Sequence, residues 1–139
     1  ETDLNSSGFD SSMFHDDDGK SWLVNMISDH RGGRFFGGIV LQEYDRDQQK
    51  LVGEVHYIFE GSERGLTEGP HIYRKDGWYY LLTAEGGTGY NHAMTIARSR
   101  DITGPWELHP QHPFVSAMEA PDNYLQKTGH GDFVETQNG

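Results

Sequence analysis

The chain has 139 residues, which is enough for one domain with a modest core. It carries 22 acidic and 11 basic residues, and its formal net charge of −11 would repel a nucleic-acid backbone or an anionic membrane surface. The chain contains no cysteine, which excludes disulfides and thiolate metal sites, and its apolar runs are too short to span a bilayer.

The first part of the chain predicts four antiparallel strands within residues 10–60. The first two, 12–15 and 21–27, flank an acidic turn that ends in Asp18-Gly19, a pair suited to a type I′ hairpin. Two further strands are expected at 35–44 and 54–59, joined by a polar turn. Four antiparallel strands with short connections are typical of one blade of a β-propeller.

The second part repeats this pattern within residues 68–116. Strands are expected at 70–75, 77–83 and 92–99, and the fourth at either 106–109 or 114–116. Residues 130–139 then open a third unit, which is cut. Apolar residues nowhere keep a 3.6-residue period, so the sequence predicts an all-β fold without helices.

Three ionisable residues occupy the same phase in these repeats. Asp10, Glu68 and His130 each lie nine positions before the glycine of a turn, at Asp18-Gly19, Asp76-Gly77 and Asn138-Gly139, and their spacings are 58 and 62. Periods of this size indicate a propeller or an array, in which the first strand of each blade lines the central channel. The three side chains should therefore converge on one cavity, and two carboxyl groups facing one cavity suit glycoside hydrolysis.

Four ordered motifs, at residues 9–14, 67–71, 84–92 and 125–130, resemble glycoside hydrolase family 43. More narrowly, they resemble its branch of β-xylosidases and α-L-arabinofuranosidases, and the resemblance covers nearly the whole chain. It implies an inverting mechanism and a five-bladed β-propeller. The chain would then be an internal fragment of the catalytic domain, with about two blades and the start of a third.

The resemblance also implies roles for individual residues. Glu68 matches the general acid, and Asp10 matches the aspartate that tunes the pKa of the acid and orients it. The general base of the family would lie upstream of Glu1, so we expect the 139-residue chain to be inactive by itself. His130 would contact the sugar or, in some members, a calcium ion, and Thr88 would lie in the loop that lines the sugar site.

A general acid must stay protonated near neutral pH, so its pKa has to rise from about 4.3. A neighbouring anionic Asp10 would raise the pKa of Glu68, because two like charges resist joint ionisation. The expected substrates are xylo-oligosaccharides, cleaved at β-1,4 bonds from their ends, or arabinosyl compounds, and no cofactor is required. The resemblance allows a homo-oligomer of the full-length enzyme and favours a cytoplasmic location, while the compartment stays open.

Other interpretations remain at this stage. Taken alone, Asp10 suits a loop before a strand, Glu68 a solvated charge, and His130 a structural hydrogen bond. An α-L-arabinofuranosidase or arabinanase of the same family would differ only in the shape of its pocket. A noncatalytic propeller that binds a glycan or a protein is the alternative of another class, although WD40 and kelch repeats have shorter periods of about 40–50 residues.

Overall fold

The computed structural model describes residues 6–29 and 35–137, and these form nine β-strands and no helix. The all-β prediction is confirmed for this part of the chain, in which no helix suited to crossing a membrane occurs. The predicted turn at Asn138-Gly139 lies outside the described residues.

The first sheet has the four antiparallel strands that the sequence predicts. Its strands are β1 (Phe9–His15), β2 (Ser21–Ser28), β3 (Phe36–Asp45) and β4 (Lys50–Phe59), antiparallel and in the order β1-β2-β3-β4. A hairpin joins β1 to β2 as expected, with the backbone N–H of Gly19 donating to the carbonyl of Asp16 at 3.1 Å and the N–H of Lys20 to the carboxylate of Asp18 at 2.8 Å. Its turn is not the predicted type I′, because of the pair Asp18-Gly19 only Gly19 has a positive φ, of 89°. Strand β4 begins four residues before its predicted start.

The second sheet has one strand more than predicted. It runs β5 (Glu68–Lys75), β6 (Trp78–Glu85), β7 (Ala93–Ser99) and β8 (Glu107–Leu108), and β9 (Val115–Ser116) also pairs with β7. Both candidate segments for the fourth strand thus bind the same edge, one at each end of β7. Pro110 and Pro113 lie between them and lack an N–H group, so one continuous edge strand cannot form.

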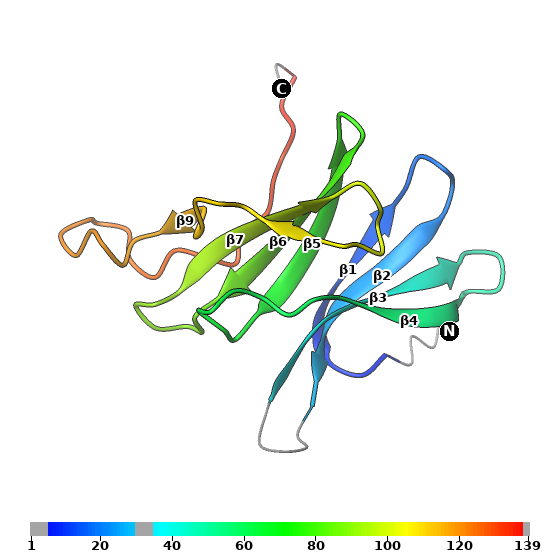
Figure 1. Ribbon diagram of the computed structural model, residues 1–139, viewed down its shortest axis with the longest axis horizontal. Helices are drawn as coiled ribbons and strands as arrows, with labels where there is room; N and C mark the ends of the chain where they lie inside the picture. Colours follow the sequence, from blue (N-terminus) through cyan, green and yellow to red (C-terminus); the bar gives the residue numbers. More distant parts are fainter. Residues whose placement is uncertain (1–5, 30–34, 138–139) are drawn as a thin grey trace.

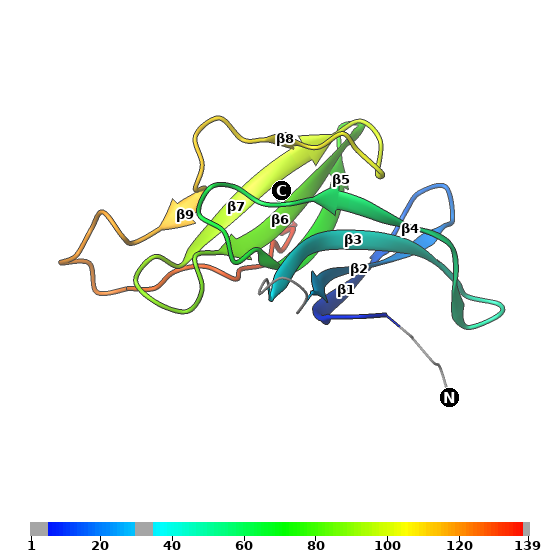
Figure 2. The same ribbon diagram turned by 60° about the horizontal axis from the view of Figure 1, so that its bottom comes forward.

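The two sheets lie side by side and enclose the core between them (Figures 1 and 2). The core residues from the first sheet alternate with outward ones along each strand, as sheet geometry requires. The second sheet contributes fewer residues to the core. The buried cluster comprises Phe14, Trp22, Val24, Met26, Ile39, Leu41 and Ile58 of the first sheet, Ile72, Leu81 and Ala97 of the second, and Ile102 of the loop between β7 and β8.

Strands β1 and β5 are neighbours and keep the same phase. The hydroxyl of Ser12 donates to the carbonyl of Pro70 at 2.7 Å, and the guanidinium of Arg74 donates to the carboxylate of Asp16 at 2.7 Å. Both pairs are 58 positions apart in sequence. Because the interval is equal for both pairs, the two strands run in the same direction with equivalent positions side by side. The same interval separates Asp10 from Glu68.

Residues 130–137 form no strand in this structure. The third repeat unit that the sequence suggests at 130–139 therefore stays a prediction. What the described residues of this segment do instead is cross the second sheet, where the hydroxyl of Tyr73 accepts the N–H of Phe133 at 3.0 Å.

We expect the buried carboxylate of Asp16 to stabilise the junction between the sheets. It accepts hydrogen bonds from Arg74 and, at 2.6 Å, from the hydroxyl of Tyr79; burial and this bond raise the pKa of Tyr79 to about 12. Asp16→Ala removes the acceptor of Tyr79 and the nearer acceptor of Arg74, and should cost about 2 kcal/mol, measured as a lower unfolding temperature of the full-length protein.

Asp17→Ala is the matched control. Asp17 also contacts Arg74, at 3.3 Å, but its side chain is 86% exposed, so its loss should cost less than about 1 kcal/mol. Equal unfolding temperatures for the Asp16 and Asp17 variants would contradict the stabilising role of Asp16.

Candidate active site

The sequence suggests that Asp10 and Glu68 precede their strands, but the structure places both residues within strands. Asp10 is the second residue of β1 and Glu68 the first of β5. Both strands are irregular at this point, with register shifts between Phe9 and Ser12 and between Glu68 and His71. A β-bulge re-aims a side chain, and bulges are frequent next to active sites. The repeated bulge explains why a strand position can present a carboxyl group to the edge of the sheet.

His130 reaches the same place from a segment that crosses the second sheet. A Cβ atom at Gly69 would lie 2.6 Å from Nε2 of His130, and one at Gly129 would lie 2.5 Å from Nε2 of His92. A Cβ at Gly131 would lie 3.1 Å from the sulfur of Met94. The segment is therefore pressed against the sheet through glycines, and this close approach is what carries the imidazole to Glu68.

The structure brings the three predicted residues together. One ligand atom each of Asp10, Glu68 and His130 lies within 4.8 Å of the other two, although the residues span 120 positions of sequence. All three side chains keep access to solvent. Asp10 and His130 hold left-handed backbone conformations, with φ of 56° and 47°. Such angles are uncommon outside glycine and concentrate at functional sites.

The environment raises the pKa of the Glu68 carboxyl group. Burial is the largest cause, the negative charge of Asp10 raises the pKa further, and His130 and His92 act in the opposite direction. The sequence-based expectation named only Asp10. Burial disfavours the charged form of a carboxyl group, so both causes favour a protonated Glu68.

His92 is a site residue that sequence reasoning missed. It precedes β7, is 8% exposed, and its Nδ1 has no hydrogen-bond partner among the described residues. Its ring supports the backbone of Gly129, and its charge affects Glu68. Its position within the motif at 84–92 was the available signal, but a buried histidine gives no pattern of its own.

Thr88 lies in the loop between β6 and β7, and its side chain is exposed. This loop begins beside the carboxyl pair, because Ala84 near the end of β6 pairs with Glu68. The contact of Thr88 with a sugar stays a prediction.

The three-residue cluster fits calcium poorly. Calcium takes six to eight oxygen ligands, whereas this set offers two carboxyl groups and one imidazole nitrogen. Within the described ranges, the group of side chains placed to hold a metal is this one, and His71, His92, His109 and His112 are not part of it. A hollow of about 510 Å³ lies away from this cluster and is lined by residues such as Tyr73, Phe114 and Phe133.

Comparison with known proteins agrees with this geometry. The family model described as "Glycosyl hydrolases family 43" matches residues 1–139. The chain belongs to glycosyl hydrolase family 43. The family resemblance of the four motifs is thereby confirmed.

Relatives within family 43 include xylosidases. The chain is 58% identical over 137 residues to "Xylosidase/arabinosidase 43B" of Humicola insolens, covering 98% of this chain and 26% of that protein. It is 58% identical over 134 residues to "Beta-xylosidase" of Bacillus subtilis (strain 168), covering 96% and 25%. The chain thus spans about a quarter of the length of the curated relatives it matches.

Solved structures of the family share the fold. The crystal structure of xylan β-1,4-xylosidase from Bacillus halodurans C-125 matches with a TM-score of 0.95 and 61% identity, covering 98% of this chain and 26% of that one. The two sheets therefore belong to a β-propeller, as predicted, and the count of five blades stays a prediction.

We expect that the imidazole ring of His130 can occupy its position only with glycine at position 69. A methyl group at Gly69, where φ is 56°, would collide with the imidazole, so Gly69→Ala should displace His130 from the carboxyl pair. A crystal structure of the full-length variant measures this displacement. Gly53→Ala is the control, because Gly53 has a similar φ of 71° but nothing within 4 Å of a new Cβ. A His130 ring that stays in place in Gly69→Ala would refute the prediction.

Proposed function

We propose that this chain supplies two of the three catalytic carboxyl groups of an inverting exo-β-xylosidase. The observation that carries the proposal is the Asp10–Glu68 pair, with the pKa of Glu68 raised by burial and by Asp10. The printed names of the relatives, β-xylosidase and xylosidase/arabinosidase, support xylo-oligosaccharides as substrates. The acidic net charge of −11 makes nucleic acid a poor partner.

Glu68 acts as the general acid. As the bond between the anomeric carbon and the glycosidic oxygen breaks, Glu68 gives its proton to the departing oxygen, which leaves as an alcohol. A water molecule adds its hydroxide to the anomeric carbon from the opposite face, and the general base takes the remaining proton. We place that base, an aspartate in the family, outside this 139-residue chain.

Asp10 supports the acid rather than acting as the base. Acid and base of an inverting glycosidase stand about 6.5–9.5 Å apart, to leave room for the water. An oxygen of Asp10 lies within 4.8 Å of one of Glu68, which is too close for that role. At such a distance a negative charge keeps its neighbour protonated until higher pH.

His130 and Thr88 are the proposed sugar-binding residues of the chain. The imidazole stands beside both carboxyl groups, where a ring nitrogen can hydrogen-bond a sugar hydroxyl. A calcium role for His130 is not part of the proposal, since the donor set suits that hard cation poorly and hydrolysis by two carboxyl groups needs no cofactor. A homo-oligomer of the full-length enzyme stays an expectation of the resemblance.

Two alternatives are separated by simple assays. An α-L-arabinofuranosidase or arabinanase would use the same carboxyl groups, and the name xylosidase/arabinosidase of one relative keeps this alternative open. Comparing hydrolysis of aryl xyloside and aryl arabinofuranoside by the full-length protein distinguishes them. A noncatalytic propeller would hydrolyse neither, and the clustering of Asp10 and Glu68 together with the names of the relatives favours the enzyme.

Glu68→Gln in the full-length enzyme should abolish most turnover of natural xylosides. An amide cannot protonate a poor alkoxide leaving group, and removing a general acid typically costs about 10²–10⁴-fold. A xyloside of an activated phenol needs little protonation and should be partly spared. Steady-state kinetics on both substrates checks this, and an equal loss on both would refute the acid role.

Asp10→Asn should move the alkaline limb of the pH–rate profile to lower pH. The variant removes the negative neighbour, so the pKa of Glu68 falls and the acid loses its proton earlier, while burial keeps part of the increase. The profile of kcat/KM measures the shift. An unmoved limb would remove the tuning role and leave Asp10 only an orienting or substrate-binding one.

A further inference from the structure

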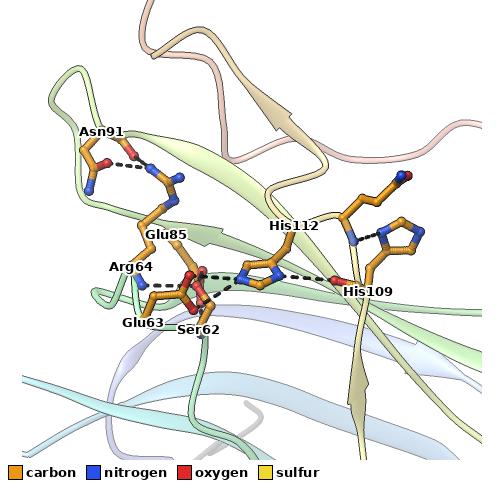
Figure 3. Close-up of polar contacts among 8 residues, drawn as sticks. Ser62, Glu63, Arg64, Glu85, Asn91, His109 and His112 are labelled. Atoms are coloured by element: carbon orange, nitrogen blue, oxygen red, sulfur yellow. Dashed lines mark hydrogen bonds and ion pairs between the residues drawn. The ribbon is translucent and has the colours of Figure 1, made fainter. Parts of the chain in front are cut away.

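Glu85, the last residue of β6, is a fully buried carboxyl group that the proposed reaction does not use. Burying a carboxylate is costly unless hydrogen-bond donors surround it. Its donors all come from the linker at 60–67, between β4 and β5: the N–H of Ser62 at 2.7 Å, the hydroxyl of Ser62, and the hydroxyl of Thr67 at 3.0 Å. Figure 3 shows Glu85 reaching the linker at Ser62. The side chain of Glu85 thus binds the linker to β6 through Ser62 near its start and Thr67 at its end.

The linker closes tightly around this carboxyl group. A Cβ atom at Gly61 would lie 1.9 Å from the hydroxyl of Thr67 and 2.7 Å from the carboxylate of Glu85, so only glycine fits. Leu66 holds a φ of 54°, which is unfavourable for a bulky side chain. Such a backbone persists only where its surroundings impose it. The bonds from Glu85 to either side of Leu66 provide that constraint.

The same linker is tied to its neighbouring loops. The carbonyl of Gly65 accepts the N–H of Gly86 at 2.8 Å, and the guanidinium of Arg64 donates to the carbonyl of Asn91 at 2.9 Å. On the other side, the carboxylate of Glu63 pairs with His112 at 3.1 Å (Figure 3). The linker is therefore one braced element, with Glu85 at its buried centre.

This element leads directly into Glu68. Thr67 is 2% exposed and precedes Glu68, and Glu68 pairs across the sheet with Ala84, the residue before Glu85. We propose that Glu85 is a positioning residue: through Thr67 it fixes the backbone of Glu68, so that the acid points at the glycosidic oxygen. The proposal rests on the proposed acid role of Glu68.

The test is Glu85→Gln in the full-length enzyme. The amide keeps the shape, but one carboxylate oxygen accepts the N–H of Ser62 and the other accepts its hydroxyl, so in either orientation the amide nitrogen removes one acceptor and loosens the linker. A misplaced acid should cost about 10²-fold in kcat/KM on xylobiose, and clearly less on the xyloside of an activated phenol. Glu60→Gln is the matched control: it changes an exposed carboxylate at the start of the same linker, outside the bracing contacts, and should leave both substrates unaffected.

Each outcome decides the question. No loss, or an equal loss on both substrates in a folded Glu85→Gln, would overturn the positioning role. If that variant does not fold, Thr67→Val removes only one donor to Glu85, and its loss must show the same dependence on the leaving group. Glu68→Gln, measured in parallel, separates the two levels: if it lacks this dependence, the proposed function itself fails.

Discussion

The packing of β1 against β5 in the same direction is the constraint on which the site depends. Ser12 meets Pro70 and Asp16 meets Arg74, each across 58 positions of sequence. Because equivalent positions of the two strands lie side by side, Asp10 and Glu68, each two residues before this pair, must also be neighbours. The sequence repeat thereby places two equivalent carboxyl groups side by side. The buried Asp16 keeps the two strands in this alignment at the end that lies away from Asp10 and Glu68.

Regular strands alone would not produce the site. Each of its three residues depends on an irregular backbone: a bulge in β1, a bulge in β5, and a left-handed turn at His130. Glycines at 69 and 129 allow the segment that carries His130 to approach the sheet. Irregular backbone and close packing thus coincide where the chemistry is proposed. The register also shifts elsewhere, between β2 and β3 and between β3 and β4.

Much of this chain was predictable because it is local. Asp-Gly pairs predicted the hairpins at 18–19 and 76–77, alternating residues predicted the strands, and equal offsets from the turns predicted which carboxyl groups would meet. Strand ends were less certain, since β1 and β4 start earlier than the sequence suggests. The edge of the second sheet was undecided between two segments, and it uses both.

The sequence by itself determined the strand class, the hairpins and the phase of Asp10, Glu68 and His130, because turn chemistry and side-chain alternation act over a few residues. Only the tertiary structure decided how close these groups come, that burial raises the pKa of Glu68 more than Asp10 does, and that His92 supports the site. It also decided that Glu85 binds the linker. These properties depend on contacts between residues far apart in the chain and on the exclusion of water, and neither leaves a pattern in the local sequence.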